Sequence, residues 1–469
     1  MALELAAASL LGAGFTQADR LLDLSTPLGQ DRLLAERLQG TEQLSDGGFV
    51  LHVDALSDDA HIPLKAVIGQ PVQVKLQTAL GRDEHRVWCG LVSQARFEGA
   101  NGGFARYRLR VEPWLALLRQ RRDSYAFQDL SVIEIIDSVF GDYNGQGAVA
   151  PQWRWEVKDR DTYAKRSLTI QYRETDYAFI ERLLAEEGLF YWVEHEAGDG
   201  EPGTHTVVIA DHNGAFEAGP QASVKFQRAD ATETEDTIQA WRQSRTWRTN
   251  AVRLATWDYR AMQARKASAQ VDDKLPNAME LADSDYPGQY LFEDGDQGDR
   301  LAHNALAAQR LRQSLYEGEG TVRTLAPAQR FTLTGHWGPS QGAGADFVVL
   351  RIRHDARNNF DESLGRAVAQ ALGAAGESQH DEADFYRNRF EAIAASLEYR
   401  PSTQDGHGAR LHPRPTVHGA QTALVVGAAD PVHTDRDHRI KIQFHWQRGS
   451  ASSNRQDHPA GADLSLIHI

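Results

Sequence analysis

The stretch of sequence that most constrains the fold is Ser167–Glu194, SLTIQYRETDYAFIERLLAEEGLFYWVE. Ser167–Tyr172 alternates apolar and polar residues, as a half-buried strand does. Leu189–Val193 is apolar and aromatic, which favours a second, buried strand. The residues between them predict a helix. No residue in this strand–helix–strand unit is arranged for chemistry, so the pattern indicates the fold and not a catalytic site.

The helix in this unit carries signals at both of its ends. The hydroxyl of Thr175 can cap a free backbone N–H at the N-terminus, and the carboxylate of Asp176 is favoured there by the helix dipole. Gly188 stands where a left-handed residue commonly ends a helix. The residues predicted to face the core are Phe179, Ile180, Leu183 and Leu184. The residues predicted to face outward are Glu181, Arg182, Glu186 and Glu187.

Alternating segments predict strands along most of the chain. They are separated by glycine-rich turns, a pattern typical of an antiparallel sheet that curls into a sandwich or barrel. The first group is Leu21–Leu24, Leu33–Leu38, Phe49–Val53, Val72–Leu76, Val87–Val92 and Phe104–Val111. The second group is Thr206–Ala210, Trp241–Tyr259, Phe331–Thr334, Phe347–Ile352 and Phe385–Ile393.

Helices and loops are predicted between these strands. Ser131 and Glu134 form a capping-box pattern, which predicts a short helix to about Phe140. A second helix is expected over Leu301–Tyr316, with Gly318 just beyond it. The segments predicted to be irregular are a domain joint over Gly214–Asp236, a loop over Pro276–Gly298 and a mobile insertion over Gly365–His380.

One internal similarity indicates a repeat. Phe385–Ile393 resembles Phe104–Val111 in its pattern of phenylalanine, two alternating arginines and an apolar residue. Strand patterns are degenerate, so a coincidental match is the alternative. Two copies of one sheet unit would explain the similarity.

Charge and cysteine content exclude several classes of function. The formal net charge is −15, which argues against a nucleic-acid binder with a basic stripe. The single cysteine, Cys89, lies in a strand-like run and is predicted to be a buried structural thiol rather than a nucleophile. Met1–Gly14 is apolar but contains Glu4 and has no basic start, so we expect no secretory signal peptide.

The composition of the sequence changes after Pro401. Gln404–Pro415 is polar and rich in Gly, His and Pro, as linkers are. Thr422–Gly427 and His438–Trp446 then predict two strands that open a small barrel. The last residues, Leu464–Ile469, match the translation of a transposase adapter used in DNA library preparation. We expect them to be an assembly scar, the alternative being a natural C-terminus.

A search for catalytic or metal-binding patterns gives only weak candidates. Glu194-His195-Glu196 lacks the helical second histidine of a zinc site, and we expect a solvated strand end. Glu186 and Glu187 point about 100° apart on a helix and cannot flank one bond. The remaining candidates, for which surface or packing roles are predicted, are the basic run Arg119–Arg122, the histidines His407, His412, His418, His433, His438 and His445, and the tryptophans Trp241, Trp247 and Trp257. We predict no catalytic, cofactor-binding or metal-binding residue and no enzyme activity.

Several long motifs resemble the VgrG proteins, the trimeric spikes of type VI secretion systems. The most specific motif is QYRETDYAFIERLLAEEGLFYWVEH at Gln171–His195. The others are Arg122–Asp129 with Val132–Ile136, Leu64–Val72, Phe385–Ala392 with Tyr399–Pro401, His418–Gly427 and Asp437–Gly449. The resemblance extends from about Arg20 to Asp463.

The resemblance implies an α+β, β-rich fold similar to the hub of contractile phage baseplates. That fold has two tube-type β-barrel domains with α/β insertions, followed here by a partial OB-type barrel. The implied parts are an N-terminal segment at 1–19, a hub-like domain at 20–402, a linker at 403–415, an incomplete OB-fold at 416–463 and the scar at 464–469. Within the hub-like domain, the implied tube subdomains lie at about 20–120 and 240–400, and the α/β insertion lies at about 121–215.

The resemblance also implies a mechanical function. A homotrimer would dock on the hexameric Hcp tube and puncture target envelopes, with a PAAR-type tip protein and effectors bound through the needle that this sequence lacks. It would assemble in the bacterial cytoplasm and leave through the secretion system, without nucleic acid, cofactor or small-molecule substrate. The alternatives are a hub of a contractile phage tail, or a spike fused to a hydrolase effector in the missing part. A trimer requires an exposed apolar surface on the isolated chain, for which the aromatic residues of Trp241–Tyr259 are candidates.

Overall fold

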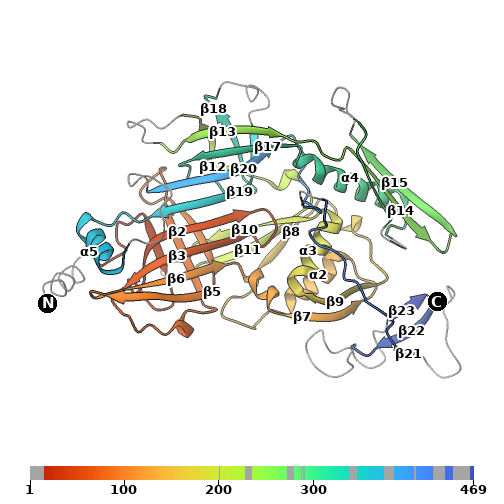
Figure 1. Cartoon of the computed structure of the whole chain (residues 1–469), viewed down its shortest axis with the longest axis horizontal. Helices are drawn as coiled ribbons and strands as arrows, with labels where there is room; N and C mark the ends of the chain where they lie inside the picture. Colours follow the sequence, from red (N-terminus) through yellow and green to blue (C-terminus); the bar gives the residue numbers. More distant parts are fainter. Residues whose placement is uncertain are drawn as a thin grey trace.

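The computed structural model shows an elongated molecule with α5 (Glu362–Leu372) at one end and a small C-terminal sheet at the opposite end (Figure 1). The structure describes residues 15–199, 201–227, 235–271, 279–286, 288, 291–336, 346–373, 385–405, 408–425, 439–446 and 465–468.

A twelve-stranded sheet forms the body of the molecule. Ten of its strands follow one path, in the order β1-β4-β5-β6-β3-β2-β19-β20-β17-β13, and β18 joins β12 to β19. The bounds in the first half are β1 Leu22–Ser25, β2 Leu34–Gln43, β3 Phe49–Ser57, β4 Pro71–Gln77, β5 His85–Asn101 and β6 Phe104–Glu112. The bounds in the second half are β12 Ala218–Lys225, β13 Ile238–Arg245, β17 Ser314–Gly320, β18 Arg330–Thr334, β19 Asp346–Arg357 and β20 Tyr386–Ala394.

The two halves of this sheet are copies of one unit. The first half has the order β1-β4-β5-β6-β3-β2, and the second has the order β12-β18-β19-β20-β17-β13. Both sets also follow the same order along the chain, so each strand of the first half has one counterpart in the second. The pairing of β1 with β4 is antiparallel and that of β12 with β18 is parallel. The predicted repeat is confirmed, because β6 and β20 hold the two similar sequence segments.

Bulges fix the alignment of the two copies residue by residue. The pairing of β5 with β6 shifts at Ser93, and that of β19 with β20 shifts at Leu350. Aligning these bulges places Arg108 at the position of Arg389, as the sequence similarity does. Both arginines bind a carboxylate on the next strand: Arg108 lies 2.6 Å from Asp54, and Arg389 lies 3.8 Å from Glu319. Geometry and sequence therefore give the same correspondence.

The two copies are joined into one sheet by β2 and β19, which pair antiparallel from Arg37↔Arg357 to Gln43↔Arg351. Each copy has its own apolar core. The first core includes Leu38, Val53 and Leu109, and the second includes Phe331, Phe347 and Phe390. The two predicted barrel-like units therefore share one continuous sheet and keep separate cores.

The α/β insertion follows β6 and contains the strand–helix–strand unit. Its elements are η2 Trp114–Arg119, β7 Arg122–Phe127, α2 Val132–Gly141, β8 Trp153–Glu156, η3 Arg160–Thr162, β9 Thr169–Thr175, α3 Asp176–Glu187, β10 Phe190–Glu196 and β11 Thr204–Ala210. Thr175 caps α3 by accepting a hydrogen bond from Ala178 N at 3.1 Å, and Gly188 ends it at φ +75°. Ser131 and Glu134 form the capping box of α2. These predicted caps are confirmed.

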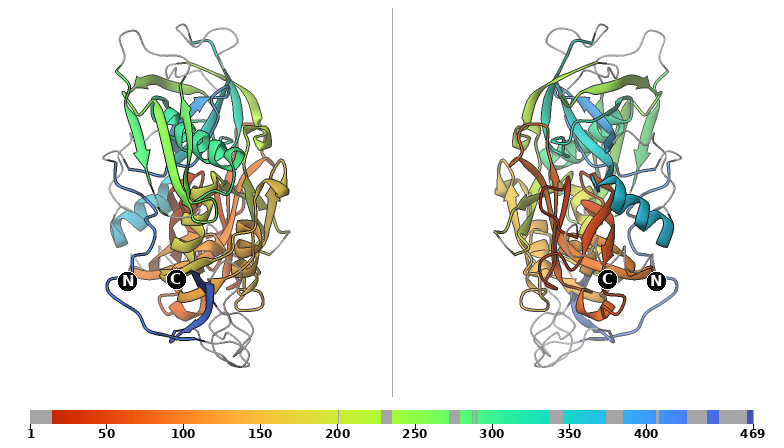
Figure 2. Two further views of the ribbon diagram at one scale, coloured as in Figure 1. Left: turned by 90° about the vertical axis from the view of Figure 1, so that its right-hand side faces the viewer. Right: turned by 90° about the vertical axis from the view of Figure 1, so that its left-hand side faces the viewer.

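A second insertion lies between β13 and β17. It comprises a three-stranded sheet and a helix, with bounds β14 Ala251–Asp258, β15 Gln263–Gln270, β16 Ala282–Asp285 and α4 Gly295–Leu311. The helix α4 lies along one face of the β14–β15 hairpin (Figure 2). Val252, Ala267 and Phe292 pack against Ala302 and Leu306 in this small core.

The C-terminal strands β21 Ala423–Val425, β22 Arg439–Phe444 and β23 Ser465–His468 form a three-stranded antiparallel sheet. The strands predicted at 422–427 and 438–446 are confirmed where they are described. The predicted loop at 450–463 lies outside the described residues, and so do Leu464 and Ile469 of the predicted scar. Residues 465–468 pair with β22.

Two predicted irregular segments contain regular structure. The predicted joint Gly214–Asp236 includes β12, whose Val224 is fully buried and whose backbone pairs with β18. The predicted loop Pro276–Gly298 includes β16 and the first turn of α4, which Asp294 caps by accepting from Gln297 N. Tertiary pairing stabilises β12 and β16, neither of which has strong apolar periodicity, whereas the first turn of α4 has a local cap.

Two further boundaries were wrong. The predicted helix Leu301–Tyr316 extends from Gly295 to Leu311 instead. Tyr316 belongs to β17 and stacks on Trp241 at 5.4 Å, so sheet packing overrides helix propensity there. The predicted mobile insertion Gly365–His380 begins as α5, because Leu364 and Val368 bury against Leu56 and Phe104; residues 374–384 lie outside the described residues.

Candidate functional site

Two edges of the large sheet are open within the described part of the chain. The strand β13 pairs with β17 along Ile238–Arg245, and no described strand pairs with its other side beyond Ile238. The strand β5 pairs with β4 only up to Leu91, which leaves the same side of Gln94–Asn101 without a described partner strand. Open edges present unpaired N–H and C=O groups to another chain.

The β2–β19 junction shows how such edges are joined in this fold. The strand β2 is the counterpart of β13, and β19 is the counterpart of β5. Where β2 ends, Leu44 N donates to Leu350 O at 2.9 Å. The side chain of Leu44 is 6% exposed and packs with Phe190, Val348 and Tyr399. The junction is therefore stabilised by backbone pairing and by the buried apolar side chain of Leu44.

A buried polar cluster fixes the same junction. Nε2 of His354 lies 2.8 Å from Glu42 Oε1, and its Nδ1 lies 2.8 Å from the Tyr386 hydroxyl. Arg86 donates to the other Glu42 oxygen at 2.7 Å. Burial alone would raise the pKa of Glu42, but Arg86 and His354 outweigh it and hold that pKa far below its ordinary value. The carboxylate is thus ionised and matched inside the protein.

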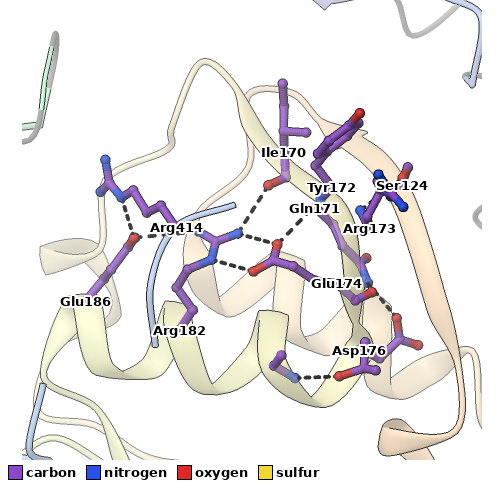
Figure 3. A network of polar contacts seen from close by, with 12 residues as sticks. Ser124, Ile170, Gln171, Tyr172, Arg173, Glu174, Asp176, Arg182, Glu186 and Arg414 are labelled. Carbon is purple, nitrogen blue, oxygen red and sulfur yellow. Dashed lines mark hydrogen bonds and ion pairs between the residues drawn. The ribbon is translucent and has the colours of Figure 1, made fainter. Parts of the chain in front are cut away.

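A second charged network surrounds α3 (Figure 3). Arg182 forms two hydrogen bonds to Glu174, at 2.9 and 2.8 Å, and a third to Ile170 O at 3.2 Å. Gln171 donates to Asp176 at 2.8 Å. These contacts tie the helix to the preceding strand β9. Glu181, Arg182 and Glu187 are each 5% exposed, so the prediction that they face outward is wrong. Helical spacing could not reveal this, because their partners lie on other elements: Glu174 on β9 binds Arg182, Tyr191 on β10 binds Glu181, and Arg300 on α4 binds Glu187.

The neighbouring carboxylates Glu186 and Glu187 share Arg166. The guanidinium donates to Glu186 at 2.9 Å and to Glu187 through its other nitrogen. Arg300 of α4 donates to Glu187 at 2.6 Å. Burial opposes the ionisation of Glu187, but Arg166 and Arg300 outweigh it and lower its pKa. The pair therefore has a structural role in joining α3 to α4, and nothing in its geometry resembles an acid–base pair.

The segment after Pro401 is held across this region by polar contacts. Arg414 donates to Glu186 at 2.8 Å, as Figure 3 shows. Gln404 donates to Asp283 at 2.8 Å, and Gln421 donates to the Tyr172 hydroxyl at 2.6 Å. A groove of about 710 Å³ lies beneath the segment, between α3, α4 and β14. The segment thus connects the hub to the small C-terminal sheet.

Glu181 is a buried carboxyl group with an altered pKa. It accepts a hydrogen bond from the Tyr191 hydroxyl, which in turn accepts from Gly47 N at 2.6 Å. Burial raises the pKa of Glu181 to about 7. The group lies among the β2–β3 turn, α3 and β10, where its two hydrogen-bond partners are parts of the fold, so we expect its ionisation to affect stability.

The residues considered for chemistry occupy structural positions. Cys89 is buried, as predicted, and burial raises the pKa of its thiol to about 12. His195 is not a solvated strand end: its Nδ1 accepts from Cys89 N at 3.1 Å, and burial lowers its pKa to about 3. Glu194 binds Arg154 through both oxygens. Arg119, in the predicted surface run, is partly buried and binds Glu112 at 2.7 Å.

The histidines of the last part are scattered. His445 contacts Thr422 at 2.9 Å, while His412 and His418 lie in loops. His407, His433 and His438 lie outside the described residues. Within the described part of the chain, no group of His, Cys, Asp and Glu is arranged to hold a metal ion.

The tryptophans divide into packed and exposed positions. Trp241 packs among Tyr316, Phe347 and Phe390 in the second core. Trp247 is 69% exposed and Trp257 is 36% exposed. Phe97, on the open part of β5, is 43% exposed. Two large apolar side chains are thus exposed near the open edges, Trp247 just after β13 and Phe97 on β5, and Trp257 is exposed on β14. Among the described residues, no helix is both long and apolar enough to cross a bilayer.

Comparison with known proteins gives a consistent result. A family profile described as "Phage tail baseplate hub (GPD)" matches residues 41–360. The type VI secretion system spike proteins VgrG1b and VgrG1a of Pseudomonas aeruginosa are each 30% identical to this chain over 448 residues, 93% of its length. The chain spans 54% and 62% of the length of these two relatives.

Solved structures show the same fold. The E. coli c3393 protein, described as a component of the type VI secretion system with structural similarity to T4 bacteriophage tail proteins gp27 and gp5, aligns with a TM-score of 0.61 at 18% identity. The alignment covers 90% of this chain and 89% of that one. A chain of the Francisella PdpA–VgrG complex aligns with a TM-score of 0.53 at 10% identity, covering 98% of this chain and 67% of that one.

Proposed function

This chain belongs to the phage tail baseplate hub (GPD) family, and we propose that it is the hub of a type VI secretion spike, a trimeric tip that docks on the Hcp tube and is driven through a target envelope. The proposal follows the similarity to the VgrG spike proteins. In this account the chain works through shape and self-association and is not an enzyme.

The observation that carries the proposal is the internal repeat with its two open edges. Within one chain, the edge of β2 is joined to the edge of β19. The equivalent edges, on β13 and β5, have no described partner strand. A head-to-tail contact between copies that repeats the internal junction closes a ring if the rotation matches. Three copies then present six similar units, which matches the symmetry of a hexameric tube.

The course of the chain gives the ring a direction. Both insertions and the segment after Pro401 leave the sheet at the end where β2, β6, β13 and β20 finish. The opposite end carries the β5–β6 hairpin and α5 (Figure 1). We assign the α5 end to the tube and the insertion end to the spike. The insertion end leads into the C-terminal sheet, the expected base of an OB-type barrel and a needle that takes a PAAR-type tip and effectors.

A hub of a contractile phage tail is the second candidate, because the matching family is described as a phage tail baseplate hub. Both candidates use the same ring. The neighbouring genes distinguish the two candidates, because sheath and secretion genes accompany a secretion spike and capsid genes accompany a phage tail hub. In the secretion case the protein assembles in the cytoplasm and leaves through the system itself.

The proposal is tested by measuring the mass of the chain by size-exclusion chromatography with light scattering, alone and with a purified hexameric tube protein of the same genome. We expect concentration-dependent association up to three copies and co-elution with the tube ring. A chain that stays a single subunit up to about 100 μM and never meets the tube ring would overturn it, because ring closure needs an association well tighter than this.

A further inference from the structure

We propose that β13 of one copy pairs antiparallel with Gln94–Asn101 of β5 in the next copy, and that Trp247 is the anchor of this junction. The inference rests on the ring assembly proposed above. It adds the register and the residue that determine how one copy recognises the next.

The position of β13 in the junction follows from its correspondence with β2. The pairing of β2 shifts at Glu36, and that of β13 shifts at Gln239. Counting from these bulges places Ala240–Thr246 at the positions of Arg37–Gln43. One hydrogen bond confirms the count: Gln43 N donates to Gly48 O at 2.7 Å, and Thr246 N donates to the equivalent Gln313 O at 3.0 Å.

The position of β5 follows in the same way from β19. The bulges at Ser93 and Leu350 place Gln94–Phe97 at the positions of Arg351–His354. Within one chain, Thr41 pairs with Arg353 and Gly40 pairs with His354. Transferred to the contact between copies, Ser244 therefore lies opposite Arg96, and Gln243 lies opposite Phe97.

Trp247 is the residue that distinguishes the open edge from the closed one. It follows Thr246, just as Leu44 follows Gln43. Leu44 is 6% exposed, whereas Trp247 is 69% exposed. Leu44 N donates to Leu350 O, the bulge residue of β19. The equivalent acceptor for Trp247 N is Ser93 O of the neighbouring copy, so the indole is buried only when two copies meet.

The open part of β5, which is the other edge of the proposed junction, also exposes an apolar side chain. Phe97 is 43% exposed and lies beside Tyr107, with 5.3 Å between the ring centroids. The register places the stem of Gln243 over this ring. A large aromatic residue at the end of a backbone-paired edge is typical of an interface hot spot. The occupant of this edge is thus a second copy of the same chain.

The first test compares Trp247→Ala with Trp257→Ala. Both changes remove one exposed tryptophan, but Trp257 lies on β14, away from the junction. We expect Trp247→Ala to weaken self-association by about 30-fold or more, as measured by sedimentation equilibrium, with an unchanged melting temperature at a concentration where the chain is a single subunit. We expect Trp257→Ala to associate like the unmodified chain.

The second test uses disulfide cross-linking to measure the register of the strands between copies. The double variant Ser244→Cys/Arg96→Cys should form a disulfide between copies under mild oxidation, because directly opposed residues of antiparallel strands have Cα atoms about 4.5–5.5 Å apart, within the range that a disulfide spans. The variant Ser244→Cys/Gln94→Cys, displaced by two residues on the same face, should cross-link several-fold less. The native Cys89 is buried and its pKa is raised, so it contributes little background.

The outcomes separate the two proposals. Normal association of Trp247→Ala, or equal cross-linking of both cysteine pairs, would overturn the junction while leaving the ring intact. Failure of the unmodified chain to associate at any concentration would overturn the ring and the junction together.

Discussion

Glu42 and His354 lie 2.8 Å apart and almost fully buried, on the two strands that join the copies of the repeated unit. They come from positions far apart in the sequence, and each has a second partner, Arg86 and Tyr386 respectively. The union of the two copies is therefore specified by a polar cluster as well as by backbone pairing. A buried, matched charge stabilises only the arrangement that matches it.

Replacing Glu42 by Gln should lower the free energy of unfolding at pH 7 by roughly 3 kcal/mol, because Arg86 is left buried without its counter-charge. The pKa of Glu42 is depressed in the folded state. Its stabilisation is therefore complete above the ordinary value of 4.5 and declines progressively as the pH falls from 4.5 towards the depressed pKa of the folded state. Urea unfolding at pH 7 and pH 3.5 measures this. The exposed Glu98→Gln is the control, and equal stability of E42Q and the unmodified chain at pH 7 would contradict the prediction.

Glu181 should show the opposite pH dependence. Burial raises its pKa from 4.5 to about 7, so the folded state holds a proton that the unfolded state releases between these values. Stability from this group is complete below pH 4.5 and is lost as the pH rises through 7. Glu181→Gln cannot ionise, so we expect a gain of about 1–3 kcal/mol over the unmodified chain at pH 8 and little difference at pH 4.5. A constant difference across this range in urea titrations would show that Glu181 does not titrate here.

Gly188→Ala should destabilise the chain more than Gly145→Ala. Both glycines have a positive φ, +75° and +71°. A Cβ at Gly188 would lie 2.5 Å from Asn304 and 3.0 Å from Arg400, whereas a Cβ at Gly145 meets nothing within 4 Å. We expect a loss of about 1 kcal/mol at Gly145 from backbone strain and of roughly 2–4 kcal/mol at Gly188. Thermal unfolding of both variants measures the difference, and equal losses would mean that the close packing of α3 against α4 contributes nothing.

Arg414→Ala should loosen the segment that connects the hub to the C-terminal sheet. Its side chain is 45% exposed and binds Glu186, which Arg166 also holds. The hub therefore keeps its own pairing, and we expect its melting temperature to change by less than about 2 °C. Hydrogen exchange of residues 408–421 should accelerate at least several-fold. Arg366→Ala, which removes another exposed ion pair, is the control and should leave that exchange unchanged.

The ends of α2 and α3 show what local sequence can specify. Thr175, Ser131 and Gly188 act on backbone groups within a few residues of themselves, so their roles were predicted and are confirmed. The strand β12 was missed because it is stabilised by pairing with β18, which is far along the chain, whereas the start of α4 was missed although Asp294 caps it locally. Glu181, Arg182 and Glu187 were assigned to the surface because the burial of a charged residue depends on partners in other elements, which helical periodicity does not reveal.

The sequence by itself determined the β-rich class, the helix caps and the repeat of β6 in β20, because alternation, capping and similarity between strands are local properties of the chain. It also carried the motifs of the baseplate hub family. Only the tertiary structure decided that the two copies form one sheet, that Glu42 meets His354, and that Leu44 is buried while its counterpart Trp247 is exposed. Those relationships join residues that are distant in the sequence, and strand pairing between them is set by the packing of the whole sheet.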